Sequence, residues 1–213
     1  MYIPAHFEEK RPEVLHGLIE RHPLGALVTN GPDGLDANHV PFEFDPAKGP
    51  LGTLRAHVAR ANPVWREAAD RPDALVIFQG ATAYISPTWY PSKHETHRQV
   101  PTWNYMVVHA HGRIIVHDDE TFVRGLVARL TRKMEAGETK PWKMGDAPPD
   151  FIAQMVGAIV GIEIEVTKLT GKWKLGQNKD SADRVGAAEA LRAHGSDARQ
   201  DVAEAMLKAP PAL

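Results

Sequence analysis

The chain has 213 residues, of which 43% are hydrophobic and 24% are charged, and these values are typical of a globular protein rather than a disordered or fibrous one. Its net charge is −2, so no overall basic field draws it to nucleic acid. It contains no cysteine, which excludes disulfides, thiolate metal sites and cysteine nucleophiles. No secretory leader and no apolar stretch of roughly 18 residues are present, so we expect a cytoplasmic protein without a membrane segment.

The first half of the sequence predicts one short helix and then a series of strands. Residues 12–21 carry apolar side chains at helical spacing, with a proline at the start of the run and another just after it. Strand patterns bounded by turn residues then cover residues 24–30, 35–44, 51–59, 74–79 and 82–86. Asn62 and Pro63 predict a helix start after the third of these strands, because asparagine accepts free amides there and proline fits the first turn.

The second half contains a long loop, further strands and the longest helices. Residues 87–104 are polar and aromatic, so we expect function to concentrate in this loop. Residues 105–117 predict either a strand pair or one strand with a glycine bulge. The remaining patterns are a helix that begins at Asp118-Asp119-Glu120 and reaches residue 136, a helix over 150–156, a strand over 161–169 and a helix-prone tail over 187–213.

This order of elements indicates a mainly β, α+β protein. Strands dominate the first part without βαβ regularity, which fits a small antiparallel barrel with helical additions better than a doubly wound sheet. We expect one barrel domain over residues 1–186 and a C-terminal helical tail over residues 187–213.

Three segments carry side chains suited to binding a phosphate or a planar ring. At residues 55–63, Arg60 and the amides beside Asn62 can form an anion cradle, since helix N-termini and guanidinium groups both bind phosphate; the alternative is a structural cap beside a salt-bridged arginine. Residues 84–93 combine aromatics, hydroxyls and a lysine, which suits a phosphorylated heterocycle or a subunit interface. In the third segment, Asn104 can bind a flavin edge and Thr102 a phosphate or ribityl hydroxyl.

Residues 171–179 form a basic aromatic segment after the last predicted strand. This stretch is either part of the same site or a solvent-facing lysine cluster with Trp173 packed beneath it.

Four segments together resemble the PaiB family: HVARANPVW, AYISPTWYPSK, VPTWNYMVVHAHG and WKLGQNKDSADRVG. That family is similar to pyridoxamine-phosphate-oxidase-like split barrels, generally homodimers that hold FMN between two barrels. It is described as a group of FMN-binding, negative transcriptional regulators linked to protease synthesis and sporulation. The resemblance therefore implies an FMN-binding split-barrel homodimer with a regulatory role. Gly176 departs from the usual WKLSQN form, so a hydroxyl contribution at that position is in doubt.

The resemblance also implies which residues contact the cofactor. Arg60 and Asn62 match positions where split-barrel flavoproteins bind the FMN phosphate, and His57 and Ser86 would face the same cleft. The predicted cofactor-binding residues are His57, Arg60, Asn62, Ser86, Lys93, Thr102, Trp103, Asn104, Lys174 and Gln177.

Two other functions stay open. An FMN-dependent oxidoreductase would need a general acid or base. The sequence does not single out one, although His57 and His109 are candidates. A haem- or metal-binding barrel would draw on four histidines, His94, His97, His109 and His111. No HExxH pattern accompanies them, so we assign no metal ligands.

Direct contact with DNA would depend on the basic side of the helix predicted from residue 120. Its candidate residues are Arg124, Arg129, Arg132 and Lys133. A solvated face of a packing helix explains the same pattern, and no helix-turn-helix is evident.

Overall fold

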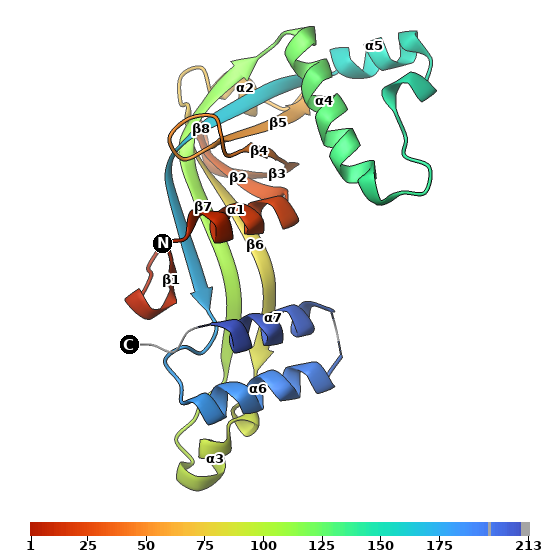
Figure 1. Cartoon of the computed structure of the whole chain (residues 1–213). Helices are drawn as coiled ribbons and strands as arrows, with labels where there is room; N and C mark the ends of the chain where they lie inside the picture. The colour runs from red at the N-terminus through yellow and green to blue at the C-terminus, as the bar shows by residue number, and fades with distance from the viewer. Residues whose placement is uncertain (196, 210–213) are drawn as a thin grey trace. The chain divides into compact units, whose positions relative to one another are not determined.

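The computed structural model describes residues 1–195 and 197–209 and contains one eight-stranded sheet with helices (Figure 1). The strand order is β3-β2-β6-β7-β8-β5-β4, with β1 pairing to β8. The strands are β1 (Glu8–Glu9), β2 (Leu24–Gly31), β3 (Gly34–Pro41), β4 (Glu43–Asp45), β5 (Thr53–Ala59), β6 (Asp73–Ile85), β7 (Thr102–His117) and β8 (Ile159–Lys174). The α-helices are α1 (Pro12–Arg21), α2 (Val64–Glu67), α3 (Pro91–Thr96), α4 (Glu120–Met134), α5 (Pro149–Gly157), α6 (Ser181–Ala193) and α7 (Asp197–Lys208).

Long strands replace several of the shorter predicted ones. β6 continues through Gly80, so the break predicted there is wrong. β7 is one strand that already begins at Thr102, inside the predicted loop. At Gly112 a Cβ atom would collide with the carbonyl oxygen of Glu165. Glycine at this position therefore allows β7 and β8 to approach closely.

The predicted loop over residues 87–104 also contains helical turns. A 3-10 turn covers Pro87–Trp89, where the hydroxyl of Ser86 accepts a hydrogen bond from the amide of Thr88. α3 follows at once, with Pro91 in its first turn, and ends at His97 in the left-handed conformation. A proline at the start of the 3-10 turn and another at the start of α3 favour helix, but the many polar and aromatic residues of this segment led to the prediction of a loop.

The chain divides into two compact units. Unit 1 comprises Met1–Leu18, Gln79–Val108 and Thr170–Leu213, and unit 2 comprises Ile19–Phe78 and His109–Leu169. The strands β6, β7 and β8 contribute residues to both. α6 continues without a break across residue 186, and the predicted boundary between residues 1–186 and 187–213 stays a prediction.

The core of unit 1 forms where α6 and α7, which lie side by side in Figure 1, pack on strand residues. Leu191 of α6 and Val202 and Met206 of α7 are almost fully buried against Ile85 of β6 and Leu175. The helix-prone tail is therefore part of a hydrophobic core as far as it is described. Residue 196 and residues 210–213 of the predicted tail lie outside the described residues.

Unit 2 has an apolar interior between its strands and a helical pair on its surface. Its buried strand residues include Leu27, Leu54, Phe78 and Ile162, and Phe42 is buried between β3 and β4. Another small cluster joins α4 to α5 through three buried side chains, those of Val123, Ile152 and Val156.

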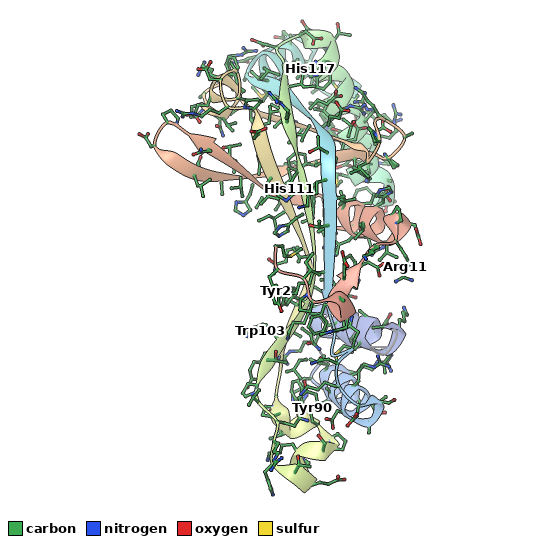
Figure 2. The ribbon with its side chains drawn as sticks, turned by 90° about the vertical axis from the view of Figure 1, so that its left-hand side faces the viewer. Tyr2, Arg11, Tyr90, Trp103, His111 and His117 are labelled. Atoms are coloured by element: carbon green, nitrogen blue, oxygen red, sulfur yellow. The ribbon has the colours of Figure 1, made fainter. Side chains whose placement is uncertain are left out.

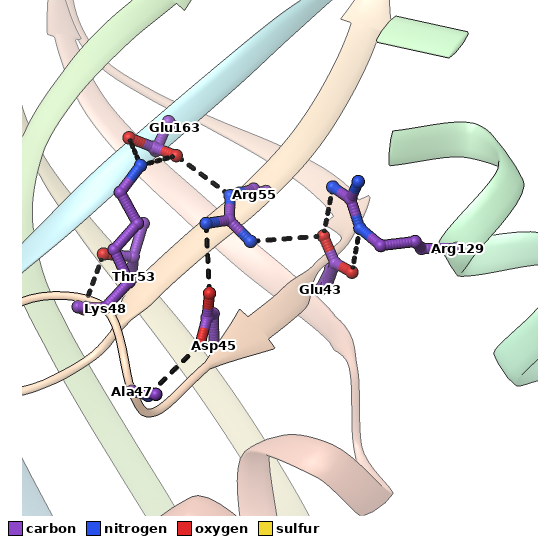
Figure 3. A network of polar contacts seen from close by, with 8 residues as sticks. All are labelled: Glu43, Asp45, Ala47, Lys48, Thr53, Arg55, Arg129 and Glu163. Atoms are coloured by element: carbon purple, nitrogen blue, oxygen red, sulfur yellow. Dashed lines mark hydrogen bonds and ion pairs between the residues drawn. The ribbon is translucent and has the colours of Figure 1, made fainter. Parts of the chain in front are cut away.

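A network of charged side chains links three strands of unit 2 to α4 (Figure 3). Glu43 on β4, Arg55 on β5 and Glu163 on β8 lie opposite one another in the sheet. Arg55 donates to Glu163 at 2.9 Å, and Lys48 donates to the same carboxylate at 2.8 Å. Arg129 of α4 donates to Glu43 at 2.6 Å. Because Arg55 and Glu163 are largely shielded from water, each depends on its partners for charge compensation.

Candidate functional site

The predicted cofactor residues fall in both units, and each unit is described by itself. His57, Arg60 and Asn62 belong to unit 2. The other predicted residues belong to unit 1: Ser86, Lys93, Thr102, Trp103, Asn104, Lys174 and Gln177.

In unit 2 the predicted anion cradle is engaged with protein groups. Arg60 donates two hydrogen bonds to the carboxylate of Asp118, at 2.6 and 2.9 Å, and a third to the carbonyl of Gly157 at 2.8 Å. The hydrogen bonds to Asp118 raise the pKa of Arg60. Asn62 accepts from the amide of Val64 at 3.0 Å, as expected of a cap, but α2 is only four residues long. These contacts match the alternative stated above, a helix cap beside a salt-bridged arginine. A role of Arg60 and Asn62 in phosphate binding stays a prediction.

The histidines of unit 2 lie in surroundings that favour their neutral form. His57 is paired across the sheet with Gly161, its Nδ1 is buried without a hydrogen-bond partner, and burial lowers its pKa. Burial also lowers the pKa values of His109 and His111 on β7. Neutral imidazoles here offer little anion-binding charge at neutral pH.

The alternative of a metal-binding barrel receives no support from the geometry. Across residues 1–195 and 197–209, no group of three or more histidine, cysteine, aspartate or glutamate side chains is placed to hold a metal ion. His94 in unit 1 contacts the carbonyl of Thr88 at 3.1 Å.

Unit 1 contains a pocket of about 230 Å³ in which three predicted residues meet: Thr102, Asn104 and Lys174. The rest of its lining comes from the N-terminal segment, the start of α3, the loop before β7 and the turn after β8, and comprises Phe7, Tyr90, Val100, Pro101, Gly176, Asn178 and Lys179. Segments far apart in sequence therefore converge on one small polar cavity.

Two lysine side chains, Lys174 and Lys179, line this pocket. Lys174 donates to the hydroxyl of Thr102 at 2.6 Å and to the carbonyl of Trp103 at 2.5 Å. Lys179 donates to the amide oxygen of Gln99 at 2.5 Å. Burial, followed by the nearby charges of Lys172 and Lys179, lowers the pKa of Lys174. In the described part of the chain none of these three lysines forms an ion pair, and such a cluster suits an anion.

An aromatic surface lies on the opposite face of β7 from Thr102 and Asn104, because consecutive side chains of a strand point to opposite faces. Trp103 directly follows Thr102, its ring is 55% exposed, and it meets the ring of Tyr84 edge-on with centroids 5.9 Å apart. The ammonium of Lys172 lies 5.5 Å from the Tyr105 ring and 5.9 Å from the Tyr2 ring. Figure 2 shows Tyr2 and Trp103 on the side of the strands that faces away from α6 and α7. This surface offers exposed ring faces to a planar ligand.

One predicted residue, Gln177, has a structural role in the turn after β8. Gln177 accepts from the amide of Leu175 at 2.8 Å and donates to the carbonyl of Trp173 at 2.6 Å, so its side chain closes the turn after β8. Gly176 in that turn has φ +80°, a conformation that glycine adopts without strain. The turn accounts for glycine at the position where the family commonly has serine.

The other predicted residues of unit 1 have different environments. Asn104 is 1% exposed, and its amide donates to the sulfur of Met206 at 3.3 Å. Ser86 caps the 3-10 turn described above. Lys93 lies in α3 with a half-buried side chain.

Sequence reasoning missed a buried network that fixes the wall of the pocket. Asp183 of α6 is 1% exposed and accepts from the amide and the hydroxyl of Ser92, at 2.9 and 2.6 Å. Gln99 donates to the same carboxylate at 3.0 Å. Burial and the charge of Asp183 raise the pKa of Tyr90 to about 12. The motifs containing Ser92 and Asp183 were visible in the sequence, but nothing in their spacing showed that they meet.

The basic face proposed for DNA contact is partly neutralised. Arg124 pairs with Glu120 at 2.8 Å, and Arg129 pairs with Glu43. Arg132 and Lys133 remain exposed on α4.

Comparisons with known proteins agree with this architecture. The family model described as "Putative FMN-binding domain" matches residues 1–168. The protease synthase and sporulation protein PAI 2 of Bacillus subtilis is 30% identical over 206 residues, covering 97% of this chain and 96% of that protein. An uncharacterized protein of Emericella nidulans is also 30% identical, with 95% of each chain covered.

Solved structures show the same fold at low sequence identity. The flavocytochrome Anf3 from Azotobacter vinelandii matches with a TM-score of 0.61 at 13% identity, covering 82% of this chain and 73% of that one. The FAD and heme binding protein from Mycobacterium smegmatis matches with a TM-score of 0.59 at 16% identity, covering 84% and 79%.

These matches agree with the predicted fold, a split barrel with helical additions. The chain belongs to the FMN-binding family that the model describes, in agreement with the resemblance to the PaiB family. FMN is the cofactor of this family. In the described residues no helix is long and apolar enough to cross a membrane.

Proposed function

We propose that this protein binds FMN in unit 1, with the phosphate held by Lys174, Lys179 and Thr102. The observation that carries the proposal is the charge of the two lysines that line the pocket. A phosphate would accept charge-assisted hydrogen bonds from both ammonium groups and would relieve their mutual repulsion.

The dimensions of the site suit one part of FMN. A pocket of about 230 Å³ is smaller than the roughly 300–1,000 Å³ that usually enclose a drug-sized ligand. The phosphate and part of the ribityl chain therefore occupy the pocket, and the isoalloxazine ring extends out of its opening. Asn104 lines the buried end of the pocket, where its amide contacts Met206.

Bound FMN would supply electron or hydride transfer, and the residues of this chain bind and orient it. Burial lowers the pKa values of His57 and His109, so these two candidate side chains are poor proton donors at neutral pH. We therefore favour a regulatory flavoprotein of the cytoplasm over an FMN-dependent oxidoreductase. The name of the Bacillus subtilis relative, a protease synthase and sporulation protein, supports a regulatory role.

We also propose that the protein acts as a homodimer and that the exposed aromatic surface of unit 1 becomes covered in it. Aromatic side chains are enriched at subunit interfaces. Direct DNA contact is the weaker part of the proposal, since Arg124 and Arg129 are engaged in ion pairs.

The test is a pair of fluorescence titrations with FMN and with riboflavin, which lacks the phosphate. The fluorescence of FMN should be quenched on binding. The dissociation constant of FMN should be at least tenfold lower than that of riboflavin, because a charged hydrogen bond contributes about 1.5–3 kcal/mol. Equal affinities would rule out the lysine pocket as a phosphate site, and no binding of either flavin would reject the proposed function.

A further inference from the structure

We propose that a groove beside α4 in unit 2 is a second binding site, which takes a small planar aromatic molecule carrying a negative charge. It belongs to a different unit from the flavin pocket and is independent of it. Its occupant is defined by the shape, the apolar lining and the charge of the groove.

The groove is formed by the last turns of α4 and the segment that leads back towards α5, which can be followed in Figure 1. Its volume is about 550 Å³, within the range of small-molecule sites. The lining is mostly apolar and comprises Ala128, Thr131, Arg132, Glu135, Ala136, Pro141, Trp142, Lys143 and Met144. Trp142 is 42% exposed and provides a flat aromatic wall.

Local contacts hold the walls in place. The amide of Trp142 donates to the carboxylate of Glu135 at 2.9 Å, and the amide of Lys143 donates to that of Asp146 at 2.9 Å. Met144 packs against the buried cluster between α4 and α5. The tryptophan is therefore carried by a segment tied to the helix at several points, as a preformed site requires.

The charge of the groove favours an anion. Arg132 and Lys143 both line it, and in the described part of the chain neither side chain forms an ion pair, whereas Arg124 and Arg129 on the same helix both do. Glu135 is the acidic residue of the lining, and its carboxylate already accepts the Trp142 amide. Two free cations beside an indole ring match an aromatic ring bearing a carboxylate or sulfonate.

The experiment uses 1-anilinonaphthalene-8-sulfonate, a fluorescent aromatic anion, and N-phenyl-1-naphthylamine, its neutral counterpart, with the full chain. Arg132→Gln and Lys143→Gln should each weaken binding of the anion about fivefold, as expected for loss of one partly exposed ion pair. Both should leave binding of the neutral probe unchanged. Trp142→Phe should remove most of the energy transfer from tryptophan to the bound probe.

Two variants serve as controls. Lys133→Gln removes a neighbouring charge of α4 that does not line the groove and should bind the anion as the wild type does. Lys174→Met alters the flavin pocket and identifies any part of the anion binding that belongs to that pocket. Thermal unfolding checks that each variant is folded, and Arg132→Lys, which keeps the charge, should retain binding if Arg132→Gln is unstable. Equal affinities in Arg132→Gln and Lys133→Gln, or loss of binding in Lys174→Met alone, would overturn the proposal.

Discussion

Replacing Lys174 by methionine removes one ammonium group from the flavin pocket and keeps most of the length of the side chain. In the structure this group donates to Thr102 and to the carbonyl of Trp103, and it is the predicted donor to the FMN phosphate. We expect the variant to bind FMN more weakly and riboflavin equally well, because only FMN carries the phosphate.

The magnitude follows from the charge of the lost contact. A hydrogen bond to a charged group contributes about 1.5–3 kcal/mol, and each 1.4 kcal/mol is a factor of ten in affinity. The dissociation constant for FMN should therefore rise roughly 10- to 150-fold. The fold should be little affected, because removing Lys174 also removes its repulsion with Lys172 and Lys179.

Flavin fluorescence titration of three variants measures this effect. Lys172→Met is the comparison variant, since Lys172 lies on the same strand but does not line the pocket, and its loss should weaken FMN binding less than the loss of Lys174 does. Arg60→Ala tests the alternative cradle in unit 2. An unchanged affinity in Lys174→Met together with a large loss in Arg60→Ala would refute the reasoning and place the phosphate at Arg60.

Three further predictions concern pH, the charged network and the turn after β8. Affinity for FMN should fall as pH rises through the pKa of Lys174, at a lower pH than for an ordinary lysine because burial lowers that pKa; a flat profile up to pH 10 would contradict this. Glu163→Gln should destabilise the protein by about 1.5 kcal/mol in urea unfolding, because Lys48 and Arg55 lose a charged partner while Arg55 keeps Asp45 and Glu43. Burial raises the pKa of Glu163, but hydrogen bonds from Lys48 and Arg55 lower it more. The Glu163 carboxylate therefore stabilises the folded protein above the ordinary glutamate pKa, and this stabilisation is lost as pH falls through the lowered pKa of the folded state. The variant should lack this part of the loss of stability in acid. Gly176→Ala should lower stability by about 1 kcal/mol in thermal unfolding, since its φ is +80°, and an unchanged melting temperature would contradict that account.

The fold class could be predicted because apolar periodicity and turn residues act locally. α1 covers the predicted residues 12–21, and the strand pairs at the start of the chain follow the alternation of their side chains. The long strands could not be predicted, because their continuity through Gly80 and Gly112 depends on pairing with neighbours distant in sequence.

The candidate site was predicted only in part. Thr102, Asn104 and Lys174 were named from the sequence and do line one pocket. Lys179 and the carboxylate of Asp183 were missed, because their roles depend on how α6 and the turn after β8 meet the loop before β7. Arg60 has the right chemistry for phosphate, but only the structure shows that Asp118 already engages it.

The most direct test of the central claim is a crystal structure of the protein with FMN bound. The account predicts the phosphate within hydrogen-bond distance of the ammonium groups of Lys174 and Lys179. A phosphate bound by Arg60, or one with no contact to either lysine, would contradict it.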